Sequence, residues 1–265
     1  MIPNVLSIAG SDPGGGAGIQ ADLKTFAALH CHGLTAVTAL TVQNTRRVFD
    51  IHLAPPDFVA AQIDALFADC EIAAVKIGML GSADIAAAVG GVLARHKPPF
   101  VVLDPVRAAS TGAALASGEL AAALVGHLAP VTNLITPNLA EAAWLCDAAL
   151  PTHLEEMEKL AGTLHQTGFQ AVLVKGGHLD TTNCDDLLFA PSGTKIYPGR
   201  RVATRNTHGT GCTLSAAIAA YVANGLTLEQ AVEAAKLFVT RALEAADRLH
   251  AGMGPGPLHH FHKFW

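Results

Sequence analysis

A glycine-rich turn, Asn206–Gly211, leads directly into Cys212 and an alanine-rich apolar run, which is the pattern of an anion-binding helix start. The first N–H groups of a helix have no partner within it, and glycine lets the backbone approach a ligand oxygen. The segment Gly209-Thr210-Gly211 should therefore stabilise negative charge. A helix N-terminus also favours the thiolate of a cysteine, so Cys212 is a candidate proton acceptor or nucleophile. The structural alternative is that Cys212 only fills core volume.

Further polar clusters each follow a short β-branched run. In a parallel sheet the carboxyl ends of the strands lie at one edge, so these clusters should converge on one ligand-binding crevice. The clusters are Gly10–Gly18, Gln43-Asn44, Gly78-Met79, Asp104–Val106, Thr136–Asn138 and Lys175–Gly177.

Three charged positions in these clusters carry the chemical argument. Asp104 ends a buried strand, where a carboxylate must be paired, solvated or bound to a metal, so it is a candidate for Mg²⁺ or for a place near phosphate. Lys175 ends another buried strand, where a cation needs a partner such as a phosphate or a neighbouring carboxylate. Asn138 and Glu141 have the spacing of a helix capping box, and helix stability alone is a full alternative to a binding role.

Alternating strand and helix patterns predict an α/β fold with helices on both faces of a parallel sheet, in a single domain over residues 1–265. A β-hairpin over Asp185–Phe189 and Lys195–Tyr197 is expected before the glycine turn. The expected strands are Val5–Ala9, Thr35–Leu40, Ile72–Ile77, Phe100–Asp104, Leu134–Thr136 and Ala171–Lys175. The expected helices are Ile19–Leu29, Pro56–Ala68, Ala83–Ala94, Glu119–His127, Leu139–Cys146, Leu154–Gln166, Thr213–Val222 and Leu228–Arg248.

The composition favours a soluble, cytoplasmic protein with a small-molecule partner. The 265 residues are 51% hydrophobic and 15% charged, enough to bury a large core. A net charge of −5 without a basic run argues against nucleic-acid binding, and no apolar run reaches the ~18 residues of a membrane helix. The 5 cysteines are scattered and never spaced as Cys-x-x-Cys, which argues against a disulfide framework or a structural zinc site.

Some familiar motifs can be excluded. The loop Gly10–Gly18 is not followed by Gly-Lys-Ser/Thr, so it is not a Walker A loop, and the turn at Gly209 lacks the third glycine of a dinucleotide fingerprint. Asp22 lies one helical turn after the loop and should face back toward the crevice, which favours a substrate-binding role for the loop. The closely spaced His259, His260 and His262 suggest a metal site, but we assign them no function.

The chain resembles the hydroxymethylpyrimidine/phosphomethylpyrimidine kinases of the ribokinase-like family. The resemblance covers nearly the whole chain and implies a three-layer αβα fold with a central, mostly parallel sheet and no separate large lid domain. It rests on the strings Ala9–Asp22, Lys76–Leu80, Thr136–Ala142, Lys175–His178 and Asn206–Ser215, and on the ending Gly256–Phe261.

The resemblance implies ATP- and Mg²⁺-dependent phosphorylation of 4-amino-5-hydroxymethyl-2-methylpyrimidine, and then of its monophosphate, in thiamine biosynthesis. A homodimer is compatible with it. The amide of Gln43 suits an aminopyrimidine edge because it offers a donor and an acceptor together. The implied pyrimidine site is Gly10, Asp22, Gln43, Met79 and Val106. The implied nucleotide and Mg²⁺ site is Asn138, Glu141, Lys175 and Lys236, with Asp104 nearby, and Gly209, Thr210, Gly211 and Cys212 would hold the transferring phosphoryl group.

Two positions depart from expectation. Most ribokinase-like sugar kinases have an aspartate base where this chain has Cys212, so a thiolate with a lowered pKa would accept the hydroxymethyl proton. Arg107 stands where relatives usually have an apolar residue, which affects the expected lid segment Val106–Gly112. Pyridoxal kinase is the nearest alternative function, and a non-catalytic vitamin-precursor sensor is the alternative from another class.

Overall fold

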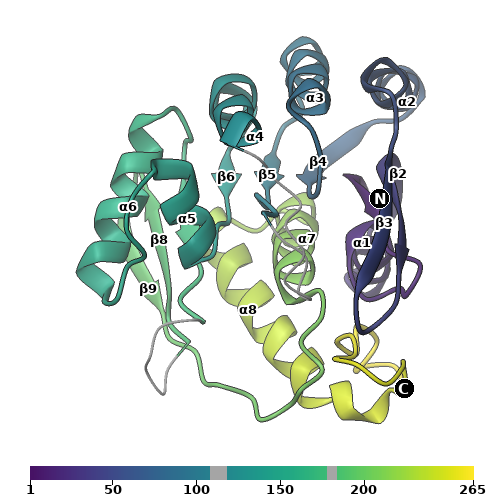
Figure 1. Ribbon diagram of the computed structural model, residues 1–265, viewed down its shortest axis with the longest axis vertical. Helices are drawn as coiled ribbons and strands as arrows, with labels where there is room; N and C mark the ends of the chain where they lie inside the picture. The colour runs from purple at the N-terminus through teal and green to yellow at the C-terminus, as the bar shows by residue number, and fades with distance from the viewer. Residues whose placement is uncertain (108–117, 178–183) are drawn as a thin grey trace.

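The computed structural model describes residues 1–107, 118–177 and 184–265, which form one mixed sheet with helices around it (Figure 1). The strand order is β3-β2-β1-β4-β5-β6-β7-β8-β9. The strands are β1 (Asn4–Ser11), β2 (His32–Gln43), β3 (Val48–Leu53), β4 (Ile72–Ile77), β5 (Val101–Leu103), β6 (Leu134–Ile135), β7 (Val172–Val174), β8 (Asp186–Ala190) and β9 (Gly193–Tyr197).

The central strands β2, β1, β4, β5, β6 and β7 run parallel, whereas β3 at one edge and β8 and β9 at the other are antiparallel to their neighbours. The α-helices are α1 (Gly18–Ala28), α2 (Pro56–Asp69), α3 (Ala83–His96), α4 (Gly118–Ala123), α5 (Leu139–Cys146), α6 (Leu154–Gln166), α7 (Thr210–Ala223) and α8 (Leu228–Glu244). This is the predicted three-layer α/β architecture.

Each face of the sheet has its own apolar core, because neighbouring residues of a strand point to opposite faces. On one face, Leu6 and Ile8 of β1 pack with residues of α2, α3 and α6. On the other face, Val5 of β1 packs with residues of α1, α7 and α8. The sheet is therefore covered on both sides, and the strand ends remain as the place for a ligand.

The parallel strands change direction of progression at β1, which lies between β2 and β4. Ligands of open α/β sheets bind outside the carboxyl ends of the strands at such a switch point. The loop after β1 and the residues after β4 and β5 therefore meet at the edge where the sequence predicted a crevice.

The structure differs from the predicted elements in a few places. Strand β3 was not predicted, and its Phe49 and Leu53 are 50% and 37% exposed, so its pattern lacks a buried face. The helix expected over Glu119–His127 is α4 followed by a π-helical turn, Leu124–Leu128. Helix α7 begins at Thr210, within the glycine turn. No helix in the described part of the chain is both long and apolar enough to span a membrane.

Candidate active site

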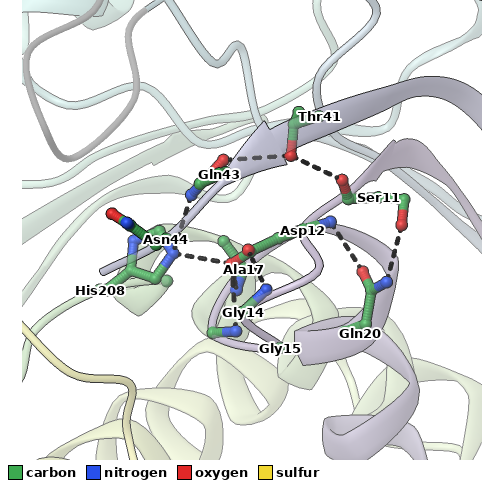
Figure 2. Close-up of polar contacts among 12 residues, drawn as sticks. Ser11, Asp12, Gly14, Gly15, Ala17, Gln20, Thr41, Gln43, Asn44 and His208 are labelled. Carbon is green, nitrogen blue, oxygen red and sulfur yellow. Dashed lines mark hydrogen bonds and ion pairs between the residues drawn. The ribbon is translucent and has the colours of Figure 1, made fainter. Parts of the chain in front are cut away.

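The glycine loop after β1 folds around the carboxylate of Asp12 (Figure 2). Its Oδ1 accepts a hydrogen bond from the N–H of Gly14 at 2.8 Å, and its Oδ2 accepts from the N–H groups of Gly16 and Ala17 at 3.1 and 2.9 Å. Burial alone would raise the pKa of Asp12, but hydrogen bonds from His208 and the backbone outweigh it and lower the pKa. The loop therefore uses these N–H groups on its own carboxylate and is not a phosphate cradle.

His208 joins this loop to the glycine turn before α7. Its Nε2 lies 2.8 Å from Asp12 Oδ2 (Figure 2). The two backbones also touch, because a Cβ added to Gly209 would lie 1.8 Å from the carbonyl oxygen of Gly16. Gly209 has φ +83° and serves as the N-cap of α7, so its conformation and its surroundings both require glycine. The sequence suggested Gly209 but not the role of Asp12 and His208 in holding it.

The start of α7 faces two charged side chains from distant strands. A Cβ added to Gly211 would lie 3.2 Å from Lys175 Nζ and 3.3 Å from Asp104 Oδ2. The helix start thus combines its own N–H groups with a cation, and it also lies beside a carboxylate. This places Gly211, Lys175 and Asp104 together, as the convergence of strand ends predicted.

Lys175 lies between the carboxylates of Asp104 and Glu141. Its Nζ is 2.9 Å from Asp104 Oδ1 and 3.8 Å from Glu141 Oε2. Burial would lower the pKa of Lys175, but the two carboxylates raise it more, so the lysine stays charged. Burial raises the pKa of Glu141, against the effect of Lys175. The ion pair that was one interpretation of Lys175 is therefore present, and it lies at the predicted phosphate site.

The capping-box interpretation of Asn138 and Glu141 is confirmed. Asn138 Oδ1 accepts from the N–H of Glu141 at 2.9 Å, and Glu141 Oε2 accepts from the N–H of Asn138 at 2.7 Å. The same Oε2 faces Lys175, so the cap also fixes a carboxylate at the site. Stabilising α5 and supplying a charge are compatible roles for Glu141.

The residues predicted for the pyrimidine lie around the ends of β1, β2, β4 and β5. A Cβ added to Gly10 would lie 3.4 Å from Met79 Sδ, so these two positions adjoin. Gln43 Nε2 is 3.4 Å from His208 Nε2, and the backbone N–H of Val106 donates to the Asp104 carbonyl at 2.9 Å. Gln43 also lines a cavity of about 440 Å³. The loop after β1 contributes Pro13 and Gly14 to its wall, and the C-terminal part of the chain contributes Ala251–Met253.

Asp22 is the exception among the predicted pyrimidine residues, because its side chain is completely buried. Lys76 Nζ binds both of its carboxylate oxygens, at 2.9 and 2.8 Å, and Ser7 Oγ donates to it at 2.6 Å. Burial raises the pKa of Asp22, with Lys76 opposing it. In this structure Asp22 is a counter-ion of Lys76, so its contact with a substrate stays a prediction. Lys76 was missed, although a lysine at the end of an apolar strand gave the same signal as Lys175.

The expected lowering of the Cys212 pKa is wrong. Burial raises the pKa of this thiol to about 11, with Asp104 and Asp22 adding to the effect and Lys76 opposing it. The N–H of Gly18 donates to the sulfur and also opposes the rise. Desolvation and two carboxylates therefore outweigh Lys76 and the Gly18 N–H at this position.

Lys236 of α8 supports the turn after β7 through an acidic partner. Its Nζ donates to Asp186 Oδ2 at 2.6 Å and to the Cys184 carbonyl at 2.7 Å. Asp186 Oδ1 accepts from the N–H of Gly176, the residue after Lys175, at 3.0 Å. A direct contact of Lys236 with nucleotide stays a prediction. The lid segment Val106–Gly112 runs into residues 108–117, which lie outside the described residues.

The C-terminal histidine segment packs against the beginning of α7. His260 is buried, with its Nε2 3.0 Å from the hydroxyl of Thr213 in the first turns of α7, and burial lowers its pKa to about 3. Just before it, the carbonyl of Gly256 accepts from the N–H of His208 at 3.1 Å. Among the described residues no cluster of His, Cys, Asp and Glu suits a metal by itself. His260 is therefore a buried structural residue that packs against the first turn of α7.

Known proteins are similar to this chain in sequence and in fold. A protein of Rhizobium meliloti called hydroxymethylpyrimidine/phosphomethylpyrimidine kinase is 50% identical over 100% of this chain and 99% of its own length. One of Escherichia coli with the same name is 48% identical over 99% of this chain and 98% of its own length. The pyridoxal kinase from Staphylococcus aureus in complex with AMP-PCP and pyridoxal has a TM-score of 0.90 at 32% identity, covering 100% of this chain and 95% of that one.

The family model described as phosphomethylpyrimidine kinase matches residues 12–259. That range contains the Asp12 loop, the Lys175 ion pair and the glycine turn at Gly209. The match to the family model and the identity to the two relatives both show that this chain belongs to the phosphomethylpyrimidine kinase family, with a ribokinase-like fold.

Proposed function

We propose that this chain phosphorylates 4-amino-5-hydroxymethyl-2-methylpyrimidine with ATP, and then phosphorylates the monophosphate, as part of thiamine biosynthesis. The observation that carries the proposal is the meeting of Gly211, Lys175 and Asp104 at the start of α7. The names of the R. meliloti and E. coli relatives support the substrate. We further propose that the whole chain is one kinase domain that works in the cytoplasm, and a homodimer remains a prediction.

Phosphoryl transfer requires mainly positioning and positive potential, because charge is spread over the oxygens of the transferring group. The hydroxymethyl oxygen attacks the γ-phosphorus, the bond to ADP breaks, and the hydroxyl proton leaves for a base. The N–H groups at the start of α7 and the ammonium of Lys175 supply the positive potential. The buried ion pair of Asp22 and Lys76 lies close enough to this helix start to act electrostatically on Cys212.

Cys212 is our proposed proton acceptor, and its raised pKa has a direct consequence. With a pKa of about 11, only a small fraction of the thiol is ionised at pH 7. If the thiolate accepts the proton, turnover rises with pH between about 7 and 10, because the thiolate fraction grows about tenfold per pH unit. Loss of the sulfur removes this dependence.

The carboxylates of Asp104 and Glu141 fit a Mg²⁺ ion that is held jointly with phosphate. Mg²⁺ in such sites usually takes one or two carboxylates, keeps several waters and binds substrate phosphates. Both carboxylates lie beside Lys175, which would contact the same phosphates. When bound, Mg²⁺ would neutralise charge that develops on the transferring group.

Pyridoxal kinase is the second candidate, because the S. aureus pyridoxal kinase matches the fold over the whole chain. The two functions separate when the purified protein is given ATP, Mg²⁺ and either the pyrimidine alcohol or pyridoxal. We expect kcat/KM for the pyrimidine to exceed that for pyridoxal by about tenfold or more. A higher kcat/KM for pyridoxal would transfer the substrate assignment to the pyridoxal kinases.

A further inference from the structure

The side chain of Gln43 lies between Thr41 and His208, at the wall of the 440 Å³ cavity (Figure 2). Its Oε1 is 3.3 Å from Thr41 Oγ1, and its Nε2 is 3.4 Å from His208 Nε2. The two ends of a glutamine amide have the same shape, so their positions follow from the hydrogen bonds around them. The orientation of this amide bears on the substrate only if Gln43 reads the pyrimidine, as the proposed function has it.

The contact with His208 brings two donors together. The Asp12 carboxylate is an acceptor, and it lies 2.8 Å from His208 Nε2, so this nitrogen must carry its hydrogen. An N–H of Gln43 therefore faces an N–H of His208. An oxygen at this end of the amide would face the N–H of His208 and share its hydrogen with Asp12, which is more favourable than two facing donors.

The contact with Thr41 has the opposite problem, because two acceptors compete there for one hydrogen. Its hydroxyl has one hydrogen, and two acceptors lie within reach, the Ser11 carbonyl at 3.0 Å and Gln43 Oε1 at 3.3 Å. With the nitrogen of Gln43 at this end, Thr41 donates to Ser11 and accepts from Gln43. One rotation of the amide by half a turn pairs its nitrogen with the Thr41 oxygen and replaces the contact of two donors at His208 with a weaker but favourable one, in which the amide oxygen shares the His208 hydrogen with Asp12.

The ring of His208 is held firmly enough to impose this choice. It is 8% exposed, and its backbone N–H donates to the Gly256 carbonyl at 3.1 Å. A Cβ added to Gly16 would lie 2.4 Å from the ring atom Cδ2, so the glycine loop packs directly against it. Asp12 fixes the far end of the ring.

We propose that Asp12 and His208 are positioning residues that set the orientation of the Gln43 amide, with Oε1 toward His208 and Nε2 toward Thr41. The amide then offers one remaining N–H and one remaining lone pair to a ligand in a fixed order. A 4-aminopyrimidine presents an amino donor beside a ring-nitrogen acceptor. In the 4-oxo analogue an oxygen replaces the amino group and the neighbouring ring nitrogen gains a proton, so the order is reversed. The network therefore determines the preference for amino over oxo pyrimidines.

The test compares kcat/KM for the 4-amino alcohol and its 4-oxo analogue in each protein. The wild type should prefer the amino compound by about 10²-fold or more, since a mismatched site leaves polar groups unpaired. His208→Leu, which has no donor for Asp12, should lower this preference by about tenfold or more. His208→Gln retains an N–H of similar reach and should stay within about threefold of the wild-type preference. The exposed His153→Gln is the control and should leave the preference unchanged.

Because His208→Leu also disturbs packing against Gly16, Thr41→Val provides an independent variant at the other end of the amide. It replaces the hydroxyl with a methyl group of similar size, and it should also lower the preference for the amino compound. General damage to the site would reduce both rates and leave their ratio unchanged. The ratio therefore reports the orientation of the amide and not the stability of the fold.

Two results would overturn the inference in different ways. If Gln43→Leu abolishes the preference while His208→Leu and Thr41→Val retain it, Gln43 reads the pyrimidine but His208 does not orient it. If Gln43→Leu itself retains the preference, the pyrimidine-reading role of Gln43 fails, and the orientation proposal fails with it.

Discussion

Adding one methyl group at Gly211 should lower catalysis while leaving the fold intact. Gly211 lies in the first turn of α7 and is not among the residues with positive φ, so alanine fits its backbone. The new Cβ would lie 3.2 Å from Lys175 Nζ and 3.3 Å from Asp104 Oδ2, so these groups must move by a few tenths of an ångström. The methyl would also occupy space beside the N–H groups that we assign to the phosphoryl oxygens.

The magnitude follows from these contacts. Losing one preorganised donor to a transition-state oxyanion costs about 10²–10³ in kcat, or about 2.7–4 kcal/mol. We therefore expect Gly211→Ala to lower kcat by about 10²-fold. Its free energy of unfolding should stay within about 1 kcal/mol of the wild type, because alanine is favoured over glycine in helices by about that amount and offsets the crowding.

The assay measures steady-state turnover of the pyrimidine with ATP, and thermal unfolding of the same samples. Gly91→Ala in α3 is the matched control, since a Cβ there meets no atom within 4 Å. It should show the same helical gain in stability and normal kinetics. Turnover of Gly211→Ala within twofold of the wild type would refute the assignment of the phosphoryl group to the start of α7.

Three further predictions follow from the buried charges. Lys76→Met leaves the Asp22 carboxylate without its cation and should lower the free energy of unfolding by about 3–5 kcal/mol. Burial raises the pKa of Asp22 and Lys76 opposes this, so without Lys76 the buried carboxyl should protonate more readily as the pH falls, and the loss should be smaller at pH 5 than at pH 8 in denaturant titrations; an equal loss at both would contradict a buried charge. The Cys212 pKa of about 11, raised from 9.0, predicts that stability falls as pH rises from about 9 to 11, and that Cys212→Ser removes this fall and lowers turnover by about 10²-fold. A Cys212→Ser enzyme with the wild-type pH profile would exclude the thiolate as base. Chelation of Mg²⁺ should lower turnover by about 10²-fold or more, reversibly and without a change in circular dichroism; full activity in excess chelator would exclude the metal.

The sequence allowed most of the sheet and the main site to be predicted, because parallel strands place their carboxyl ends at one edge. Strand β4 and helices α5 and α6 have the predicted bounds. The meeting of Gly211, Lys175 and Asp104 also follows from this rule, since each residue comes at a strand end or helix start. The local sequence left open whether Glu141 caps a helix or serves the binding site. The structure shows that the capping box and the contact with Lys175 occur together.

The remaining features depend on tertiary contacts that no local pattern carries. Strand β3 lies at the edge of the sheet and none of its side chains is fully buried. Its sequence therefore lacks the regular alternation of apolar and polar residues that would indicate a strand. His208 bonds to Asp12 across 196 positions of the chain, and only the folded structure shows that the glycine loop is built around this carboxylate. The pKa of Cys212 was expected to fall because the helix N-terminus is visible in the sequence, whereas burial and two distant carboxylates are not.

The most direct test of the account is mass analysis of the products formed from the aminopyrimidine alcohol, ATP and Mg²⁺. We predict that the alcohol gains one phosphoryl group and then a second, with one ADP released at each step. ADP release that does not depend on the pyrimidine, or a pyrimidine that binds and stays unmodified, would contradict the claim that the site at the start of α7 transfers phosphoryl groups to this substrate.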